Sequence, residues 1–312
     1  MDLRFLLLLQ EFRNSAGSFL SEPMMLISDF STYGAVVICV VVYWGVSRSS
    51  GYWIFANCAS GLYINSILKL TACVYRPWIR DPQIIPYERA LASATGYSFP
   101  SAHSQIAASF YGSCAVRAGK GRRIFRVICI VLILLVGFSR TFLGVHTPQD
   151  VLVSFAAGAA LLWANGMLFA KIKREPSFLY TAAAAGIVIV IIGVLYFHFK
   201  SYPMEYIDGV LIVDPAEMRA DGYMAAGAAL GFLCGALVEF RWVRFETDGT
   251  VLRRVIRVIL GVPFPLVLLL FIKPFVYSRI GEVNGHLIIY GVLAFYIIAL
   301  YPALFATVES KL

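Results

Sequence analysis

The chain has 312 residues, of which 60% are hydrophobic and 14% are charged, and its net charge is +8. A soluble domain would hold about 25% charged and about 45–50% apolar residues, so this composition excludes an ordinary soluble protein and indicates a membrane protein. The excess of basic residues does not indicate nucleic-acid binding, because they form short clusters between long apolar segments. Six cysteines stand singly, without the paired spacing of a zinc or redox site.

The first 22 residues contain a short run of leucines followed by alternating apolar and polar side chains. The run is too short, and its start too weakly basic, for a secretory signal peptide. We predict instead that residues 1–22 form an amphipathic segment that lies in the membrane interface.

Apolar segments of the length that crosses a bilayer, roughly 20 residues, recur along the rest of the chain. We predict nine spans, at about residues 26–46, 52–72, 102–117, 124–143, 148–170, 178–199, 222–241, 257–276 and 286–306. The third is short and rich in small or polar residues, which suits a helix in the bundle interior. The predicted fold class is therefore all-α, a polytopic transmembrane bundle with core helices in residues 23–175 and additional helices of the same bundle in residues 176–312.

Basic clusters predict the orientation of the bundle. They follow spans three, five and seven, and contain Arg117, Lys120, Arg122, Arg123, Arg126, Lys171, Lys173, Arg174, Arg241, Arg244, Arg253, Arg254 and Arg257. If nine spans alternate in direction, all three clusters lie on one face, which the positive-inside rule makes cytoplasmic. The acidic connection from residue 200 to residue 221 then lies outside, and we hypothesise that it folds over a site there and selects the substrate.

Three short polar segments interrupt the apolar pattern. They contain Lys69 with Arg76-Pro77, then Pro100-Ser101-Ala102-His103, and then Ser139-Arg140 with His146 and Asp150. The number of spans between them places all three on the same, extracytoplasmic face. Together they supply three fixed cations, two imidazoles and a carboxylate, which are groups suited to holding a phosphoryl group and attacking it.

The second and third segments each begin a predicted helix. Ser101 is a good N-cap, and Thr147 precedes a proline that suits the first helical position. Two positive helix ends are thus expected to face one anion. Asp150 lies four residues after His146, within reach of one ring nitrogen, which leaves the other nitrogen free to attack phosphorus. We therefore predict His146 as the nucleophile and Asp150 as its orienting carboxylate.

The remaining polar residues have predicted roles around the same phosphoryl group. His103 begins a different helix, and we predict that it protonates the leaving oxygen as a general acid. Lys69, Arg76 and Arg140 are expected to offset the charge on the phosphate oxygens. Fixed cations of this kind remove the need for a metal, and the site has no surplus carboxylates to hold magnesium, so we expect no metal and no cofactor.

These segments resemble the motifs of the type 2 phosphatidate phosphatase superfamily, which also contains vanadium haloperoxidases, bacterial acid phosphatases and glucose-6-phosphatase. The family pattern is a lysine, six residues and Arg-Pro, then Pro-Ser-x-His, and then Ser-Arg, five residues, a histidine, three residues and an aspartate. The resemblance covers about residues 60 to 155. Ala102 is a departure, since glycine is commonest in the family at that position.

The resemblance implies an α-helical core, a phosphohistidine intermediate on His146, proton transfer by His103 and independence from metals. It also implies phosphate contacts from several residues of this chain: Lys69, Arg76, Ser101, the backbone of Ala102, and Arg140. The layout of nine spans with an outside amino terminus also resembles that of glucose-6-phosphatase.

We expect an integral-membrane, metal-independent phosphatase that hydrolyses a phosphomonoester or diphosphate on the extracytoplasmic side of the cytoplasmic membrane or the endoplasmic reticulum. A lipid phosphate or diphosphate is the favoured substrate, because a site at the interface receives a headgroup while the tail stays in the bilayer. Three alternatives remain open: a sugar-phosphate phosphatase resembling glucose-6-phosphatase, a lipid phosphotransferase, and a non-catalytic lipid transporter or scaffold. We expect no nucleic acid among the partners.

Overall fold

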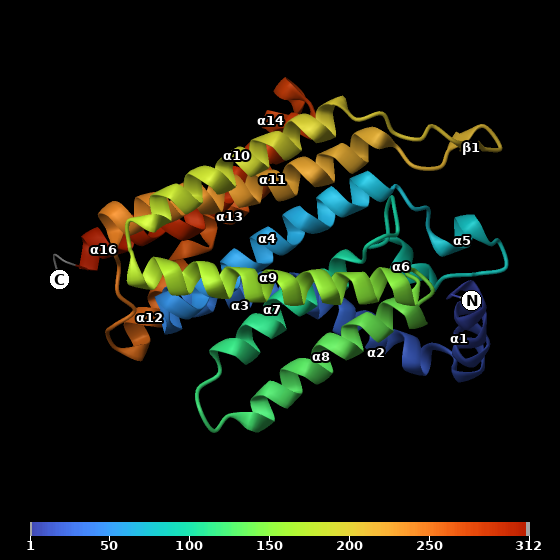
Figure 1. Ribbon diagram of the computed structural model, residues 1–312, viewed down its shortest axis with the longest axis horizontal. Coiled ribbons are helices and arrows are strands. Elements are labelled where there is room, and N and C mark those ends of the chain that lie inside the picture. The colour runs from blue at the N-terminus through green and yellow to red at the C-terminus, as the bar shows by residue number, and fades with distance from the viewer. Residues whose placement is uncertain (1, 310–312) are drawn as a thin grey trace. The chain divides into compact units, whose positions relative to one another are not determined.

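The computed structural model describes residues 2–309, which are predominantly helical (Figure 1). The helices are α1 (Asp2–Ala16), α2 (Ser18–Asp29), α3 (Ala35–Val41), α4 (Arg48–Ala72), α5 (Pro77–Arg80), α6 (Glu88–Leu91), α7 (Ala102–Arg117), α8 (Arg123–Phe142), α9 (Pro148–Arg174), α10 (Phe178–Phe199), α11 (Pro215–Val238), α12 (Val251–Gly261), α13 (Pro263–Val267), α14 (Lys273–Ile280), α15 (Glu282–Phe295) and α16 (Tyr301–Glu309). Short π-helical turns follow α2, α3, α11, α13 and α15. The strands β1 (Tyr206–Ile207) and β2 (Val210–Leu211) form an antiparallel hairpin. The predicted all-α fold class is confirmed.

Seven helices in the described part of the chain are long and apolar enough to cross a membrane. They comprise Phe19–Val46, Arg123–Phe142, Pro148–Arg174, Phe178–Phe199, Pro215–Val243, Val251–Ile280 and Glu282–Glu309. Each overlaps one predicted span, and α4 and α7 occupy the other two predicted positions. Asn57 and Asn65 lower the mean hydropathy of α4, and α7 has only 16 residues, so these two helices are less apolar or shorter than the others.

The chain divides into two compact units that interleave along the sequence. The first unit comprises Met1–Val36, Ile64–Trp163 and Tyr202–Met218, and the second comprises Val37–Tyr63, Ala164–Ser201 and Arg219–Leu312. The predicted division at residues 22 and 175 follows chain order, whereas the compact units do not, because helices distant in sequence pack together. All of the predicted site residues belong to the first unit.

In the first unit, α8 packs against α7, α2 and α1, and Figure 1 shows α7 and α8 side by side. A buried apolar cluster surrounds the end of α8, where Met25 from α2 packs with Phe142, Leu143 and Val145. Burial of such side chains contributes about 1.5–3 kcal/mol each. The cluster therefore supports the loop that carries His146.

Helix α7 lies in the interior of the first unit, as its small and polar residues predict. From His103 to Ser113 it is buried, apart from the half-buried Ile106. A Cβ atom on Gly158 of α9 would lie 2.6 Å from the Cβ of Ala108, which is closer than van der Waals contact. Small residues at this crossing thus let α7 and α9 approach closely, and both helices carry predicted site residues at their first turns.

The acidic connection between α10 and α11 contains the β1–β2 hairpin, and residues Tyr202–Met218 belong to the first unit. Met218 is buried, and its side chain occupies the space that a Cβ on Gly96 would need. The first turn of α11, which follows the connection, therefore packs on the loop before the second motif. Selection of the substrate by the connection stays a prediction.

In the second unit, aromatic side chains form the core. Tyr43 and Trp44 are buried with Tyr296, Tyr301 and Phe305. The hydroxyl of Tyr43 donates to the carbonyl of Ile298, and Nε1 of Trp44 donates to that of Ile297, each at 2.9 Å. Their polar tips are thus satisfied inside an apolar core.

Candidate active site

The loop between α8 and α9 carries His146 and is shaped by a tight turn. Gly144 has a φ of 77°, a left-handed conformation that glycine adopts without strain. The N–H groups of Val145 and His146 both donate to the carbonyl of Arg140, at 3.2 and 3.3 Å. The turn buries His146, which is 1% exposed.

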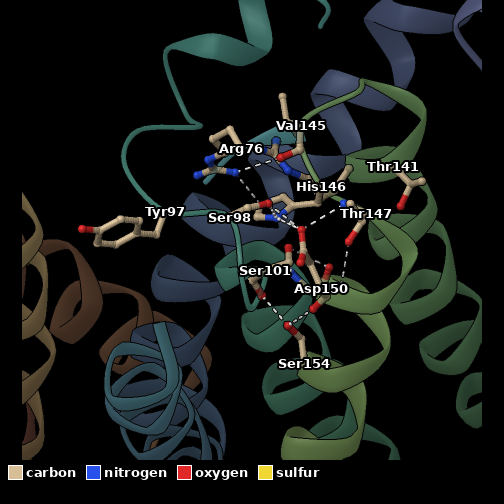
Figure 2. A network of polar contacts seen from close by, with 12 residues as sticks. Arg76, Tyr97, Ser98, Ser101, Thr141, Val145, His146, Thr147, Asp150 and Ser154 are labelled. Carbon is tan, nitrogen blue, oxygen red and sulfur yellow. Dashed lines mark hydrogen bonds and ion pairs between the residues drawn. The ribbon is translucent and has the colours of Figure 1, made fainter. Parts of the chain in front are cut away.

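Asp150 accepts three hydrogen bonds on a single carboxylate oxygen, Oδ2 (Figure 2). The donors are the Ser98 hydroxyl at 2.5 Å, the backbone N–H of Thr147 at 2.9 Å and Nδ1 of His146 at 3.3 Å. In return, the Thr147 hydroxyl accepts from the backbone N–H of Asp150 at 3.4 Å. Asp150 therefore caps α9 and orients His146 at the same time, and the predicted helix start at Thr147 is confirmed.

Arg76 lies on the opposite side of the His146 ring. Its Nη1 is 3.0 Å from Nε2 of His146 and 3.0 Å from the carbonyl oxygen of Val145. A guanidinium only donates hydrogen bonds, so Nε2 accepts and the ring proton is on Nδ1, facing Asp150. The ring nitrogen that carries the lone pair, Nε2, thus accepts a hydrogen bond from a cation. The other Arg76 nitrogens donate to Gly96 at 3.1 Å and Thr95 at 2.7 Å.

The surroundings of His146 keep its ring neutral. Burial lowers the pKa of His146 well below the 6.5 of an ordinary imidazole, and the positive charge of Arg76 lowers it further. The hydrogen bond to Asp150 acts in the opposite direction but is the weaker influence. A neutral imidazole has the lone pair that a nucleophile needs.

The second motif, residues 100–103, is hydrogen-bonded to α9 through Ser101. Ser101 caps α7, as predicted, and its hydroxyl accepts from the backbone N–H of Ser104 at 3.4 Å. Its own N–H donates to the carbonyl of Asp150 at 3.2 Å, and its carbonyl accepts from the Ser154 hydroxyl at 2.9 Å. Ala102 begins α7. The first turns of α7 and α9 are therefore held together.

His103 occupies the first turn of α7 and is 9% exposed. Within residues 2–309, its buried Nε2 has no hydrogen-bond partner. The ring lies close enough to His146, and to the three cations of the predicted site, for their charges to interact. The His103 ring, in the first turn of α7, thus lies near the His146 ring, in the loop before α9.

Lys69 and Arg140 contact different neighbours around the predicted site. Nζ of Lys69, in the last turn of α4, donates to the carbonyl of Tyr97 at 2.9 Å, directly before Ser98. Arg140 is completely buried in α8, and its Nη1 donates to the hydroxyls of Ser28 at 3.0 Å and Ser93 at 3.3 Å. Its backbone carbonyl supports the His146 loop, whereas its side chain extends toward α2.

Four serines outside the predicted set contact predicted site residues: Ser98, Ser93, Ser28 and Ser154. Ser98 stands two residues before Pro100, and its position next to the second motif is the sequence signal that points to it. The others have no such signal, because single serines are common in apolar spans. Across the described chain, no group of three or more histidine, cysteine, aspartate or glutamate side chains is arranged to hold a metal ion.

Two family models match the chain. One is described as the PAP2 superfamily and matches residues 50–174, and the other, described as the transmembrane extension of PAP2 superfamily phosphatases, matches residues 223–311. This chain belongs to the PAP2 superfamily. The first match contains every predicted site residue, and the resemblance inferred from the three motifs is confirmed. The apolar helices and the matched extension make the PAP2 member a multi-pass membrane protein.

Two curated relatives of this PAP2 member are bacterial lipid phosphatases by name. Phosphatidylglycerophosphatase B of Bacillus subtilis is 34% identical over 113 residues, which are 34% of this chain and 55% of the relative. Lipid A 1-phosphatase of Rhizobium johnstonii is 25% identical over 126 residues, which are 40% of this chain and 50% of the relative. The chain thus spans about half the length of these relatives. No solved structure matches it.

Proposed function

We propose that this PAP2 superfamily member is an integral-membrane phosphatase that releases inorganic phosphate from a lipid phosphomonoester or diphosphate. The observation that carries the proposal is the buried His146 ring, with Asp150 on its Nδ1 and Arg76 beside its Nε2. This arrangement provides a neutral nucleophile next to a cation that attracts phosphate. Relatives named for phosphatidylglycerophosphate and for lipid A favour a lipid substrate.

The proposed reaction proceeds in two displacements on phosphorus. In the first, the lone pair on Nε2 of His146 forms a bond to phosphorus, the bond to the leaving oxygen breaks, and His103 donates a proton to that oxygen. In the second, the oxygen of a water molecule forms a bond to phosphorus while His103 accepts a proton from that water; the bond between phosphorus and Nε2 breaks, inorganic phosphate leaves and the lone pair returns to Nε2 of His146. Asp150 stabilises the positive charge on the His146 ring. Lys69, Arg76, Arg140 and the N–H groups at the start of α7 balance the charge of the phosphate oxygens.

A substrate screen tests the proposal. Purified protein in detergent is given short-chain phosphatidate, phosphatidylglycerol phosphate, a polyprenyl diphosphate and glucose 6-phosphate, each with EDTA. We expect phosphate release from at least one lipid, with kcat/KM at least tenfold above that for glucose 6-phosphate. Release from no lipid would favour a transporter or scaffold. A preference for glucose 6-phosphate would contradict the lipid substrate class. Loss of activity in EDTA would contradict the independence from metals.

We also propose that the site faces the extracytoplasmic side. The basic residues between α7 and α8, at the end of α9 and after α11 support this orientation by the positive-inside rule, provided that α4 and α7 also cross the membrane. Alkaline phosphatase fused after residue 209 should be active in cells, since it is exported, and the same enzyme fused after residue 120 should be inactive. The reverse pattern would contradict the orientation.

A further inference from the structure

Neither of the two PAP2 family models matches any residue of helices α1 and α2. We infer that they nevertheless supply two positioning residues for the proposed site: Ser28, which sets the side chain of Arg140, and Arg13, which anchors the loop carrying His146. The inference rests on the proposed function, because it assigns the two residues to the binding and attack of a phosphoryl group.

Ser28 is completely buried in α2, and its hydroxyl accepts from Nη1 of Arg140 at 3.0 Å. Ser93 provides the other contacts of this guanidinium, at 3.3 Å to its hydroxyl and 3.5 Å to its carbonyl. The Ser28 contact is thus the shortest of the three. Among the described residues, Nε of Arg140 has no hydrogen-bond partner. Ser28 therefore fixes the position of the Arg140 guanidinium. The Nε–H group of that guanidinium remains available to bind an anion.

Arg13 is 6% exposed and lies near the end of α1. Its Nη1 donates to the carbonyl of Phe142, the last residue of α8, at 2.9 Å, and its Nη2 donates to the carbonyl of Ile85. A Cβ on Gly144 would lie 3.2 Å from the same Nη1 atom. Arg13 thus fills the space behind the turn that ends at His146, and it satisfies a carbonyl that α8 leaves unpaired.

The same two helices hold the connection that runs from Arg76 to the second motif. The Gln10 amide oxygen accepts from the N–H of Ile85 at 2.7 Å, and Glu22 accepts from the Tyr87 hydroxyl at 2.5 Å. Tyr87 in turn donates its N–H to the carbonyl of Leu143 at 2.9 Å, within the His146 loop. The contacts of α1 and α2 therefore converge on the segments that bear the proposed catalytic groups.

Ser28→Ala tests the first positioning role through phosphate affinity. We expect KM and the inhibition constant for inorganic vanadate to rise about threefold to tenfold with kcat nearly unchanged, because a hydrogen bond to a charged group is lost while Ser93 remains. Ser21→Ala is the control, since Ser21 is also buried in α2 and, among the described residues, its hydroxyl donates to the carbonyl of Gly17 and not to Arg140. Unchanged vanadate inhibition in Ser28→Ala would overturn the role.

A double-mutant cycle separates positioning from general destabilisation. If Ser28 acts through Arg140, Ser28→Ala adds no further loss of vanadate affinity to an Arg140→Gln protein. Equal losses in both backgrounds would overturn the inference. Vanadate protection against thermal unfolding provides the same comparison without turnover. Absence of lipid hydrolysis by the wild type would therefore reject the proposed function and leave the Ser28 result interpretable.

Arg13→Gln tests the second role through kcat. We expect kcat to fall about tenfold or more, since small displacements of reacting groups are costly, while KM changes little. We also expect faster modification of His146 by diethyl pyrocarbonate, mapped by mass spectrometry. Arg13→Lys should restore part of kcat, and Arg4→Gln, on an exposed position of α1, is the control. Wild-type kcat and wild-type labelling in Arg13→Gln would overturn the role.

Discussion

Oδ2 of Asp150 lies 3.3 Å from Nδ1 of His146, and the same oxygen accepts the backbone N–H of Thr147 that precedes α9. One carboxylate atom thus joins a helix cap to the orientation of an imidazole. The contact with His146 follows from a spacing of four residues, and the contact with Thr147 from a spacing of three, at the start of a helix. The charge of Asp150 and its capping contact can therefore be altered separately.

Substitution of Asp150 separates these two functions. Asp150→Asn keeps an acceptor for the cap but loses the charge, so we expect kcat to fall about a thousandfold or more with little change in thermal midpoint. Asp150→Ala also loses the cap, at about 1 kcal/mol. Thr250→Ala is a matched control, because the Thr250 hydroxyl caps α12 by accepting from the N–H of Arg253 at 3.3 Å. Thr250→Ala should lower the thermal midpoint and leave kcat unchanged. A fully active Asp150→Asn protein would refute the orienting role.

Ser98 donates to Asp150 at 2.5 Å and is completely buried. Ser98→Ala should lower kcat about tenfold, because the carboxylate loses one of the contacts that fix its position. Steady-state kinetics measures the effect. Ser113→Ala is the control, since Ser113 is also buried, and its hydroxyl has no hydrogen-bond partner among the described residues. Equal kcat values for the two variants would show that Ser98 has no part in orientation.

Arg76 uses all three guanidinium nitrogens to contact carbonyl groups and the His146 ring. A lysine presents a single ammonium and cannot reproduce this fork of donors. We expect Arg76→Lys to lower kcat/KM about a hundredfold or more, whereas Arg80→Lys, on the exposed end of α5, should have no effect. Retention of wild-type kcat/KM by Arg76→Lys would indicate that charge alone suffices.

The pKa of His146 predicts the acid limb of the pH profile. Because burial and Arg76 lower this pKa below 6.5, the ring stays neutral at pH values where an exposed imidazole is already protonated. We expect the acid limb of kcat/KM to have its midpoint below pH 6.5. Two substrates with different phosphate pKa values show whether the acid limb comes from an enzyme group or from the substrate. Only an enzyme group gives the same midpoint with both substrates. A shared midpoint at or above 6.5 would be inconsistent with the buried ring.

Local patterns in the sequence predicted much of the fold and part of the site. The apolar spans, the caps at Ser101 and Thr147, and the pairing of His146 with Asp150 all depend on residues close together in the chain. Hydropathy alone predicts a membrane span less clearly for α4, because its polar residues resemble those of a helix in a soluble protein.

The contacts of Arg13 and Ser28 were not predictable in the same way. Arg13 contacts a residue 129 positions away, and Ser28 contacts one 112 positions away. In the sequence, Ser28 is one hydroxyl in an apolar span, and Arg13 is one charge in a segment predicted to lie in the membrane interface. Only the packing of α1 and α2 against α8 brings these side chains to the site.

Trapping of the phosphorylated enzyme tests the central claim most directly. Protein mixed with a lipid substrate labelled with ³²P, quenched in alkali and mapped by mass spectrometry, should carry phosphate on Nε2 of His146. The His146→Ala protein should carry none and release no phosphate. Labelling of another residue, or full phosphate release by His146→Ala, would contradict His146 as the nucleophile.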